Sequence, residues 1–311
     1  MKQHTVSQVV LRQFVQEGEL LVYDRLRNTV KKIGPKGAFY LEDFDGHNPA
    51  AAENEWQSIE SALGIVYGTV QDSIHLWPLT TRGTLLDVLA LHWARSPGIK
   101  HQHREALDAA VVERQAVLRA NRRLAASMFH TATGLVPAGH EALELLIQRY
   151  PVVAARSGDE LFAASHRRLF NTAREHFERR TLQVTRFSAD ELLIGDSPVL
   201  SATSTRPGLS PQQGIALYEA EFFAMPIQPR LLVGLGPTGA DFDGLGPTGA
   251  DFDGLGPPAA EFDGPTEYAM DMNRMQFESY ERWIAAAPDS PAAEYLLGTI
   301  PGDAAIHIKA T

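Results

Sequence analysis

The hydrophobic pattern divides the chain into three parts. Near the N-terminus, two short apolar runs, "LLVYD" and "TVKKI", are separated by the turn-like "RLRN" and predict a β-hairpin within residues 1–35. Between about residues 50 and 180, apolar residues recur at spacings of three and four, as Trp56 and Ile59 do, which is typical of amphipathic helices. From Thr181 onward, runs rich in Val, Ile, Leu and Phe alternate with turn residues and predict the strands of one sheet.

Start and stop signals give approximate bounds for the helices. We expect helices over residues 50–69 and 80–96, the second capped by Thr80 or Thr81, and one long helix over 101–130. A further helix is expected to stop at Pro151, and the next to end near Arg180. After the strands, "EYAMDMNRMQFESYERWIAA" and "PAAEYLLGTI" predict two closing helices.

The segregation of helices and strands along the chain predicts an α+β fold. We expect an N-terminal hairpin, a central helical block over 50–180, and a mainly antiparallel C-terminal sheet with a closing helix over 181–311. A chain of 311 residues with 44% hydrophobic residues can bury a sizeable core. We therefore predict a single domain over residues 1–311.

A ten-residue repeat interrupts the C-terminal part. The unit "GLGPTGADFD" begins at Gly234, recurs at Gly244 and returns in altered form at Gly254. Its period and its acidic spacing match neither the twelve-residue EF-hand loop nor the nine-residue calcium roll. We interpret it as a duplication that lengthened one surface loop, over residues 234–264, because loop-closure entropy rises only logarithmically with loop length.

Removal of one whole repeat unit, residues 244–253, is therefore expected to leave folding intact. Thermal unfolding of the shortened chain checks this expectation. A melting temperature close to that of the full chain supports a passive loop, whereas a large fall shows that the loop packs as a structural element.

Composition narrows the function classes. The chain has no cysteine, which excludes disulfides, thiolate metal sites and a cysteine nucleophile. No stretch approaches the roughly 18 apolar residues of a membrane helix, and no signal-peptide run opens the chain, so we expect a cytoplasmic protein without membrane contact. The net charge is −10, and residues 187–311 hold five basic against 18 acidic residues. This acidic balance disfavours nonspecific nucleic-acid binding.

Several short motifs occur in an order known from one family. The N-terminal "HTVSQVVLRQF" resembles His-x-Val-Pro-Gln-x-x-Leu-x-x-Phe, the opening of the bacterial domain of unknown function family 4238. Similar matches follow in order along the chain: "LLVYDR", "ENEWQSIE", "ARSPG", "LLIGDSPVL", "AMPIQPRLLVGLGP" and the helix that begins near Asn273 in "MNRMQFESY".

The resemblance covers nearly the whole chain but implies no reaction, because the family has no established activity. Two positions depart from the family pattern: Ser7 stands where the family usually has Pro, and Ser197 where it usually has Asn. Ser197 has no side-chain amide, so any role of the Asn amide in the family does not carry over to this position. The resemblance therefore supplies an order of elements and a set of candidate residues.

Four acidic or histidine residues in these motifs are candidates for chemistry: His4, Glu53, Glu60 and Asp196. Glu53 and Glu60 are seven residues apart and lie on roughly one face of the predicted helix. Two carboxylates there suit a divalent cation such as Mg²⁺ or Mn²⁺. The alternative is an exposed helix face, on which Glu is common.

Each of the other candidates also has two interpretations. Asp196 follows an apolar strand and precedes Pro198, so it is either a catalytic or metal-binding carboxylate or an ordinary turn residue. His4 is either a general base or metal ligand or a hydrogen-bonded structural histidine. Arg95 either clamps a phosphate or carboxylate or binds the carbonyls at the end of its own helix.

Three functions follow from these candidates. The first is a metal-assisted hydrolase using Mg or Mn, with phosphodiesters as the candidate substrate, in which His4, Arg95 and Asp196 act catalytically and Glu53, Glu60 and Asp196 bind the metal. The second is a small-molecule enzyme that uses His and Asp as acid and base without a metal. The third is a non-catalytic binding or regulatory module. The sequence does not identify a partner.

Overall fold

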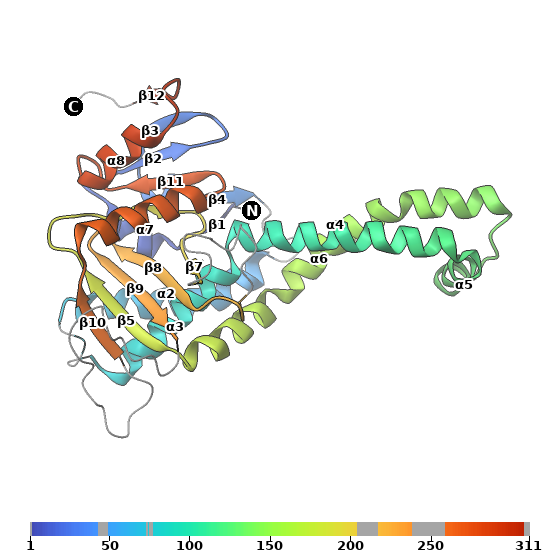
Figure 1. Ribbon diagram of the computed structural model, residues 1–311, viewed down its shortest axis with the longest axis horizontal. Coiled ribbons are helices and arrows are strands. Elements are labelled where there is room, and N and C mark those ends of the chain that lie inside the picture. Colours follow the sequence, from blue (N-terminus) through green and yellow to red (C-terminus); the bar gives the residue numbers. More distant parts are fainter. Residues whose placement is uncertain are drawn as a thin grey trace.

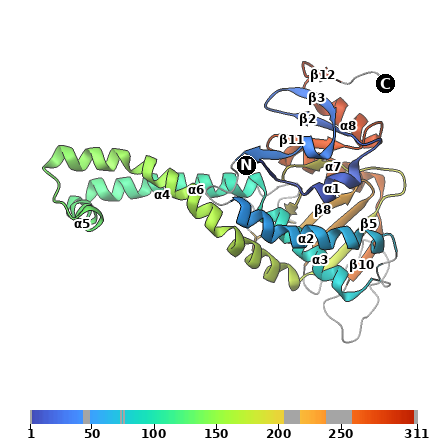
Figure 2. The same ribbon diagram turned by 180° about the vertical axis from the view of Figure 1, so that it is seen from behind.

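The computed structural model describes residues 2–42, 49–72, 74, 77–203, 217–237 and 259–307. Figures 1 and 2 show a body of two sheets with helices around them, from which a long helical arm projects. The helical and strand content confirms the predicted α+β class.

The N-terminal hairpin is confirmed. Strands β2 (Leu20–Asp24) and β3 (Thr29–Ile33) pair antiparallel in the register that places Leu20 opposite Ile33. Short elements flank the hairpin: β1 (Lys2–His4), α1 (Gln8–Leu11), the 3-10 turns η1 (Arg12–Phe14) and η2 (Pro35–Gly37), and β4 (Tyr40–Glu42). Because β1 pairs antiparallel with β4, His4 lies beside Tyr40.

The hairpin belongs to a five-stranded sheet that also contains C-terminal segments. Its order is β12-β3-β2-β11-β6, with β6 (Ile194–Gly195), β11 (Trp283–Ala286) and β12 (Ala305–His307). The prediction of one C-terminal sheet was therefore wrong for β6. The prediction of a helix through residue 286 was also wrong, because α7 (Thr266–Ser279) ends earlier and the four buried residues of β11 pair with β2.

The second sheet has the order β10-β5-β9-β8-β7 and carries helices on both faces (Figure 1). Its strands are β5 (Thr181–Arg186), β7 (Leu200–Ala202), β8 (Phe222–Gln228), β9 (Leu231–Gly236) and β10 (Ala259–Asp263). All its pairs are antiparallel except β10 with β5, which is parallel.

The predicted loop 234–264 is strand at both ends. The first Gly-Leu-Gly of the repeat lies in β9, and the altered last unit supplies β10. That last unit carries Pro258, Ala259 and Glu261 in place of Thr, Gly and Asp, and Glu261 binds the Arg186 side chain at 2.5 Å. These changes remove the glycine that opposes a strand and add a contact that fixes it to β5. The units between lie outside the described residues.

The helical block differs from its prediction in two places. Helices α2 (Pro49–Thr69) and α3 (Leu79–Ala94) occur where expected, although Pro78 and not Thr80 or Thr81 precedes α3. The expected helix over 101–130 is two helices, α4 (Pro97–Ala120) and α5 (Arg122–Thr133). They separate at Asn121, which leaves helical geometry and accepts a hydrogen bond from Leu124 N at 3.1 Å, as a helix cap does.

Pro151 does not end a helix. Helix α6 (His140–Glu178) runs through it for 39 residues. A proline inside a helix removes one backbone hydrogen bond, but α6 packs along both α3 and α4, and tertiary packing of this kind outweighs local propensity. The outer parts of α4 and α6, with α5, form the arm in Figures 1 and 2.

One large core joins the parts of the body. It contains buried side chains from α1, β2, α2, α3 and α6, from the inner face of the second sheet, and from β11. None of the helices in the described part of the chain is long and apolar enough to cross a membrane.

Candidate functional site

Arg95 joins two of the other candidate residues. It follows the last residue of α3, and its side chain is only 2% exposed. Its Nη1 donates to Glu60 Oε1 at 3.3 Å, and its Nη2 donates to the backbone carbonyl of His4. The structure therefore brings His4, Glu60 and Arg95 together, with the guanidinium linking β1 and α2 to the end of α3.

His4 is half-buried at the edge of this cluster. Its Nε2 lies 2.9 Å from Gln8 Nε2, and its ring meets the Tyr40 ring edge-on, with the ring centroids 6.4 Å apart. These contacts fix the orientation of the imidazole, as expected of a hydrogen-bonded structural histidine.

A second histidine, His92, was not a sequence candidate. It is buried on α3, where its Nδ1 lies 2.8 Å from the carbonyl of Val88 and its Nε2 accepts from Ser7 N at 3.1 Å. Burial, with the nearby charge of Arg95, lowers the pKa of His92 to about 4, although the Val88 carbonyl opposes this. His92 is therefore neutral at pH 7 and holds Ser7, at the start of α1, to α3.

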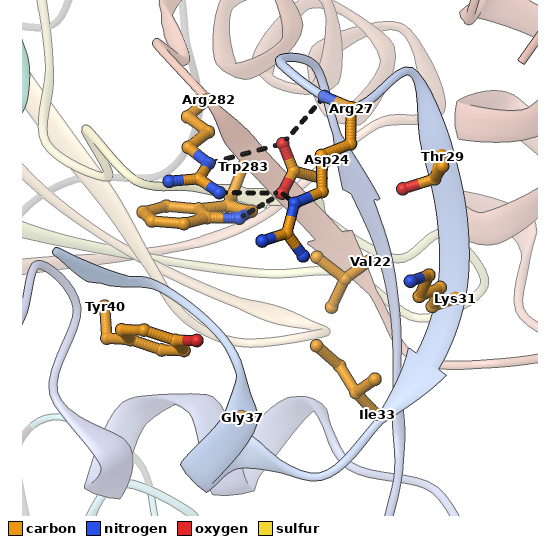
Figure 3. A pocket seen from close by; sticks show the side chains of 10 residues that line it. All are labelled: Val22, Asp24, Arg27, Thr29, Lys31, Ile33, Gly37, Tyr40, Arg282 and Trp283. Carbon is orange, nitrogen blue, oxygen red and sulfur yellow. Dashed lines mark hydrogen bonds and ion pairs between the residues drawn. The ribbon is translucent and has the colours of Figure 1, made fainter.

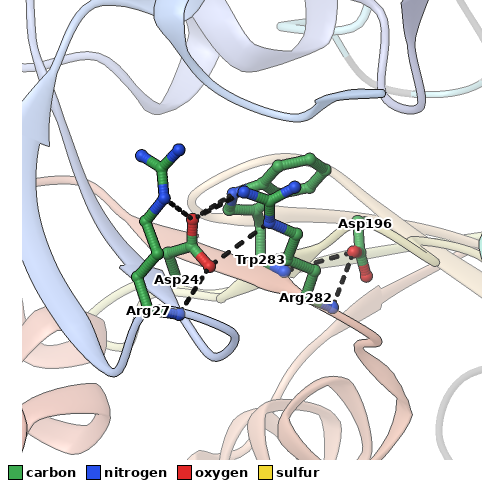
Figure 4. Close-up of polar contacts among 5 residues, drawn as sticks. All are labelled: Asp24, Arg27, Asp196, Arg282 and Trp283. Atoms are coloured by element: carbon green, nitrogen blue, oxygen red, sulfur yellow. Dashed lines mark hydrogen bonds and ion pairs between the residues drawn. The ribbon is translucent and has the colours of Figure 1, made fainter. Parts of the chain in front are cut away.

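Asp196 is buried, and backbone N–H groups surround its carboxylate (Figure 4). Its Oδ1 accepts from Glu281 N at 2.8 Å, and its Oδ2 accepts from Arg282 N at 2.9 Å and Trp283 N at 3.1 Å. Burial raises the pKa of Asp196 to about 6, against the three N–H groups, which lower it. This geometry favours the structural interpretation, in which Asp196 fixes the turn between α7 and β11.

The residues on either side of Asp196 form hydrogen bonds with both α4 and α7. Ser197 Oγ accepts from Gly98 N at 3.3 Å, at the start of α4. On the other side, Gln276 of α7 accepts from Gly195 N at 2.9 Å and donates to the carbonyl of Pro198 at 2.8 Å. The "ARSPG" and "GDSP" motifs therefore touch each other, and Ser197 makes a contact where the family pattern has Asn.

The arrangement gives little support to a shared metal. Glu60 Oε1 binds Arg95, and both oxygens of Asp196 accept hydrogen bonds from the backbone. Among the side chains that the structure describes, no three His, Asp or Glu gather closely enough to bind a metal ion. The side chain of Glu53 lies outside the described residues, so its role as a ligand stays a prediction.

Two of the three residues whose backbone N–H groups bind Asp196, namely Arg282 and Trp283, line a cavity of about 60 Å³ beside the hairpin (Figure 3). The cavity lies between β2 and β3, the start of β11, and the segment that leads into β4. Its lining residues are Val22, Asp24, Arg27, Thr29, Lys31, Ile33, Gly37, Tyr40, Arg282 and Trp283.

Asp24, the last residue of β2, organises this pocket. Its Oδ1 accepts from Arg282 Nε at 3.3 Å and from Arg27 N at 3.2 Å, and its Oδ2 accepts from Arg282 Nη2 at 3.1 Å and Trp283 Nε1 at 3.3 Å. The Arg282 guanidinium also stacks over the Trp283 ring, 4.1 Å from its centroid. Arg282 is therefore fixed by a bidentate ion pair and a cation–π contact together.

The pocket contains more positive than negative charge. Arg27, Lys31 and Arg282 carry three positive charges, and Asp24 is the single acidic residue in the lining. Within the described part of the chain, Lys31 makes no ion pair, and the buried Thr29 Oγ1 has no hydrogen-bond partner. Both residues lie on β3 at alternate positions and line the cavity (Figure 3).

The sequence candidates did not include these pocket residues. The motif "LLVYDR" contains Asp24, and the alternation of Thr29, Lys31 and Ile33 places them on one face of the hairpin, which was the available signal. Arg282 and Trp283 had no such signal, because the predicted helix covered them.

Comparison with known proteins places the whole chain in one family. No curated protein and no solved structure matches it. Residues 2–290 match the family described as "Protein of unknown function (DUF4238)", a range that includes the candidate residues and the residues of the pocket beside the hairpin. The chain therefore belongs to the DUF4238 family.

Proposed function

We propose that this protein binds a small anionic ligand through a phosphate or carboxylate group, in the pocket lined by Asp24, Arg27, Lys31 and Arg282. The observation that carries the proposal lies on β3: Thr29 Oγ1 is buried in the cavity lining without a hydrogen-bond partner among the described residues, and the half-buried Lys31 beside it lines the same cavity. A buried hydroxyl without a partner is rare unless an acceptor or donor is bound there.

The dimensions and the charge of the pocket suit such a group. A cavity needs a volume of roughly 10–15 Å³ for each water molecule that it holds. The volume of about 60 Å³ therefore accommodates on the order of five waters, or a single phosphate or carboxylate group. Arg282 offers a planar fork held in place by Asp24 and Trp283, which costs little further ordering when an oxyanion binds.

The charge of the whole chain favours a small ligand over a polymer. A protein with a net charge of −10 repels a polyanion over its surface, whereas a local excess of two positive charges attracts a single anionic group. Tyr40 and Trp283 flank the cavity and are suited to contact an organic part of the ligand.

This proposal corresponds to the binding-module alternative expected from the sequence. It gives Asp196 a positioning role, because its carboxylate holds the backbone of Arg282 and Trp283. Metal-assisted hydrolysis stays a separate prediction that depends on Glu53.

Lys31→Gln is expected to weaken phosphate binding about 10- to 100-fold, because a hydrogen bond to a charged group contributes roughly 1.5–3 kcal/mol. Calorimetric titration with inorganic phosphate at low ionic strength measures this loss. Lys32→Gln is the matched control: it removes the same charge from the next residue, whose exposed pair with Asp289 faces away from the cavity.

Two results would count against the proposal. If wild-type protein binds neither phosphate nor acetate, the pocket is not an anion site. If Lys31→Gln and Lys32→Gln weaken binding equally, the anion responds only to surface charge, and the binding site lies elsewhere.

A further inference from the structure

A second and larger pocket lies on the outer face of the β10-β5-β9-β8-β7 sheet, beside α7. It has a volume of about 620 Å³. Its walls are largely apolar, and the main contributors are Phe222, Phe262, Tyr268, Met272 and Met275. Small-molecule sites are commonly 300–1,000 Å³ and apolar, with a few polar groups that fix the orientation of the ligand.

The sequence explains why this face of the sheet is hollow. In β5, Leu182 and Val184 point into the main core, so the alternate residues, Gln183 and Thr185, face the pocket. In β9, Leu235 points into the core, and the neighbouring glycines of the first repeat unit face outward without side chains. A Cβ at Gly234 would lie 3.2 Å from the Phe222 ring, so the absence of a side chain at this position leaves space at the base of the pocket.

One polar group in this apolar lining has an unused donor. Gln183 is 6% exposed and lines the pocket, and its buried Nε2 has no hydrogen-bond partner in the described part of the chain. Its amide lies next to Gly234, since Gln183 Oε1 is 3.6 Å from the position of a Cβ there. A carbonyl oxygen is one kind of acceptor that satisfies a buried amide N–H of this kind.

Charges around the pocket disfavour an anion. The lining includes Glu221, Asp263 and Asp271 against the single basic residue Arg274, which pairs with Asp271 at 2.9 Å. The formal balance is thus two negative charges, the opposite of the pocket beside the hairpin.

We propose that this pocket binds a neutral, mainly aromatic or aliphatic molecule whose carbonyl oxygen accepts a hydrogen bond from Gln183 Nε2. The volume sets the size of the ligand, the Phe and Met side chains contact its body, and the amide of Gln183 fixes its orientation. The site is separate from the anion pocket and does not depend on it.

The probe for this test is prodan, a neutral naphthalene ketone whose emission shifts to the blue when it leaves water. We expect saturable binding to the full chain, with about 3- to 10-fold weaker binding to Gln183→Leu, which keeps the size of the side chain but removes the donor. Dimethylaminonaphthalene, which lacks the carbonyl, is expected to bind both proteins equally.

A blocking variant and its control locate the probe. Ala202→Phe fills the lining and is expected to abolish binding of both compounds, whereas Ala109→Phe, at an exposed position of α4, leaves binding unchanged. Inorganic phosphate should not displace prodan, because the two pockets are separate. A negative result with prodan therefore does not bear on the anion site, and a negative result with phosphate does not bear on this pocket. The inference is overturned if prodan does not bind, or if Gln183→Leu and Ala202→Phe bind it as the wild type does.

Discussion

Asp196→Ala is expected to lower the free energy of unfolding by about 3–5 kcal/mol, because it leaves three backbone N–H groups, one buried and two partly buried, without this acceptor. These groups belong to Glu281, Arg282 and Trp283, which connect α7 to β11. Asp196→Asn should lower the free energy of unfolding by less. Its amide oxygen still accepts hydrogen bonds from two of these N–H groups, whereas its NH₂ group is a donor and cannot accept from the third.

Urea denaturation of both variants measures this effect. Asp303→Ala is the control, since it removes an exposed aspartate with a change expected within about 0.5 kcal/mol. An Asp196→Ala protein as stable as Asp303→Ala would show that the turn before β11 does not need the carboxylate.

The pH dependence follows from the raised pKa of Asp196. Burial moves this pKa from 3.8 to about 6 in the folded state, so the folded protein holds the proton more tightly than the unfolded chain does. The stabilisation from this group is therefore greatest below the unfolded pKa and falls as the pH rises from about 4 to 6. The stability difference between wild type and Asp196→Asn is accordingly expected to shrink over that interval.

Arg95→Met is expected to lower the free energy of unfolding by about 2–4 kcal/mol. The substitution removes the buried guanidinium that joins Glu60 and the carbonyl of His4, and breaking a buried ion pair by removing one member is destabilising. The value is below that of a fully buried pair because the Glu60 side chain is 22% exposed.

Arg12→Met, at an exposed position of η1, is the matched control for this substitution. A double variant, Arg95→Met with Glu60→Met, should lose less stability than the sum of the two single variants, as expected for residues in contact. If chemical denaturation shows that the stability losses of the two single variants add up to that of the double variant, Arg95 and Glu60 do not stabilise the fold through their mutual contact.

Local patterns predicted the parts of the fold that depend on local order. The β2–β3 hairpin consists of two short strand-forming runs with a short turn between them, α2 has apolar residues at helical spacing, and α3 is an apolar segment that ends before Pro97, so each could be identified from its own residues. Strand β11 could not, because "ERWIAA" continues the apolar pattern of α7. The backbone that follows the helix is bound by the Asp196 carboxylate, 85 residues earlier in the chain, which no local pattern shows.

Local patterns also failed to show which residues of the candidate site come together in space. Arg95 binds Glu60 and the backbone carbonyl of His4, and Asp196 binds backbone N–H groups, so these candidates do not face a common cavity. Lys31 and Arg282 looked like ordinary surface residues in the sequence. Only the pairing of β11 with β2 places them around one pocket.

We propose that Asp196 and Asp24 together position Arg282 beside Lys31 to bind an anion. A crystal structure of the protein grown with inorganic phosphate tests this arrangement. We expect a phosphate in the cavity beside the hairpin, within hydrogen-bond distance of Lys31 Nζ and the Arg282 guanidinium. A structure in which that cavity holds only water while phosphate occupies another part of the surface would contradict it.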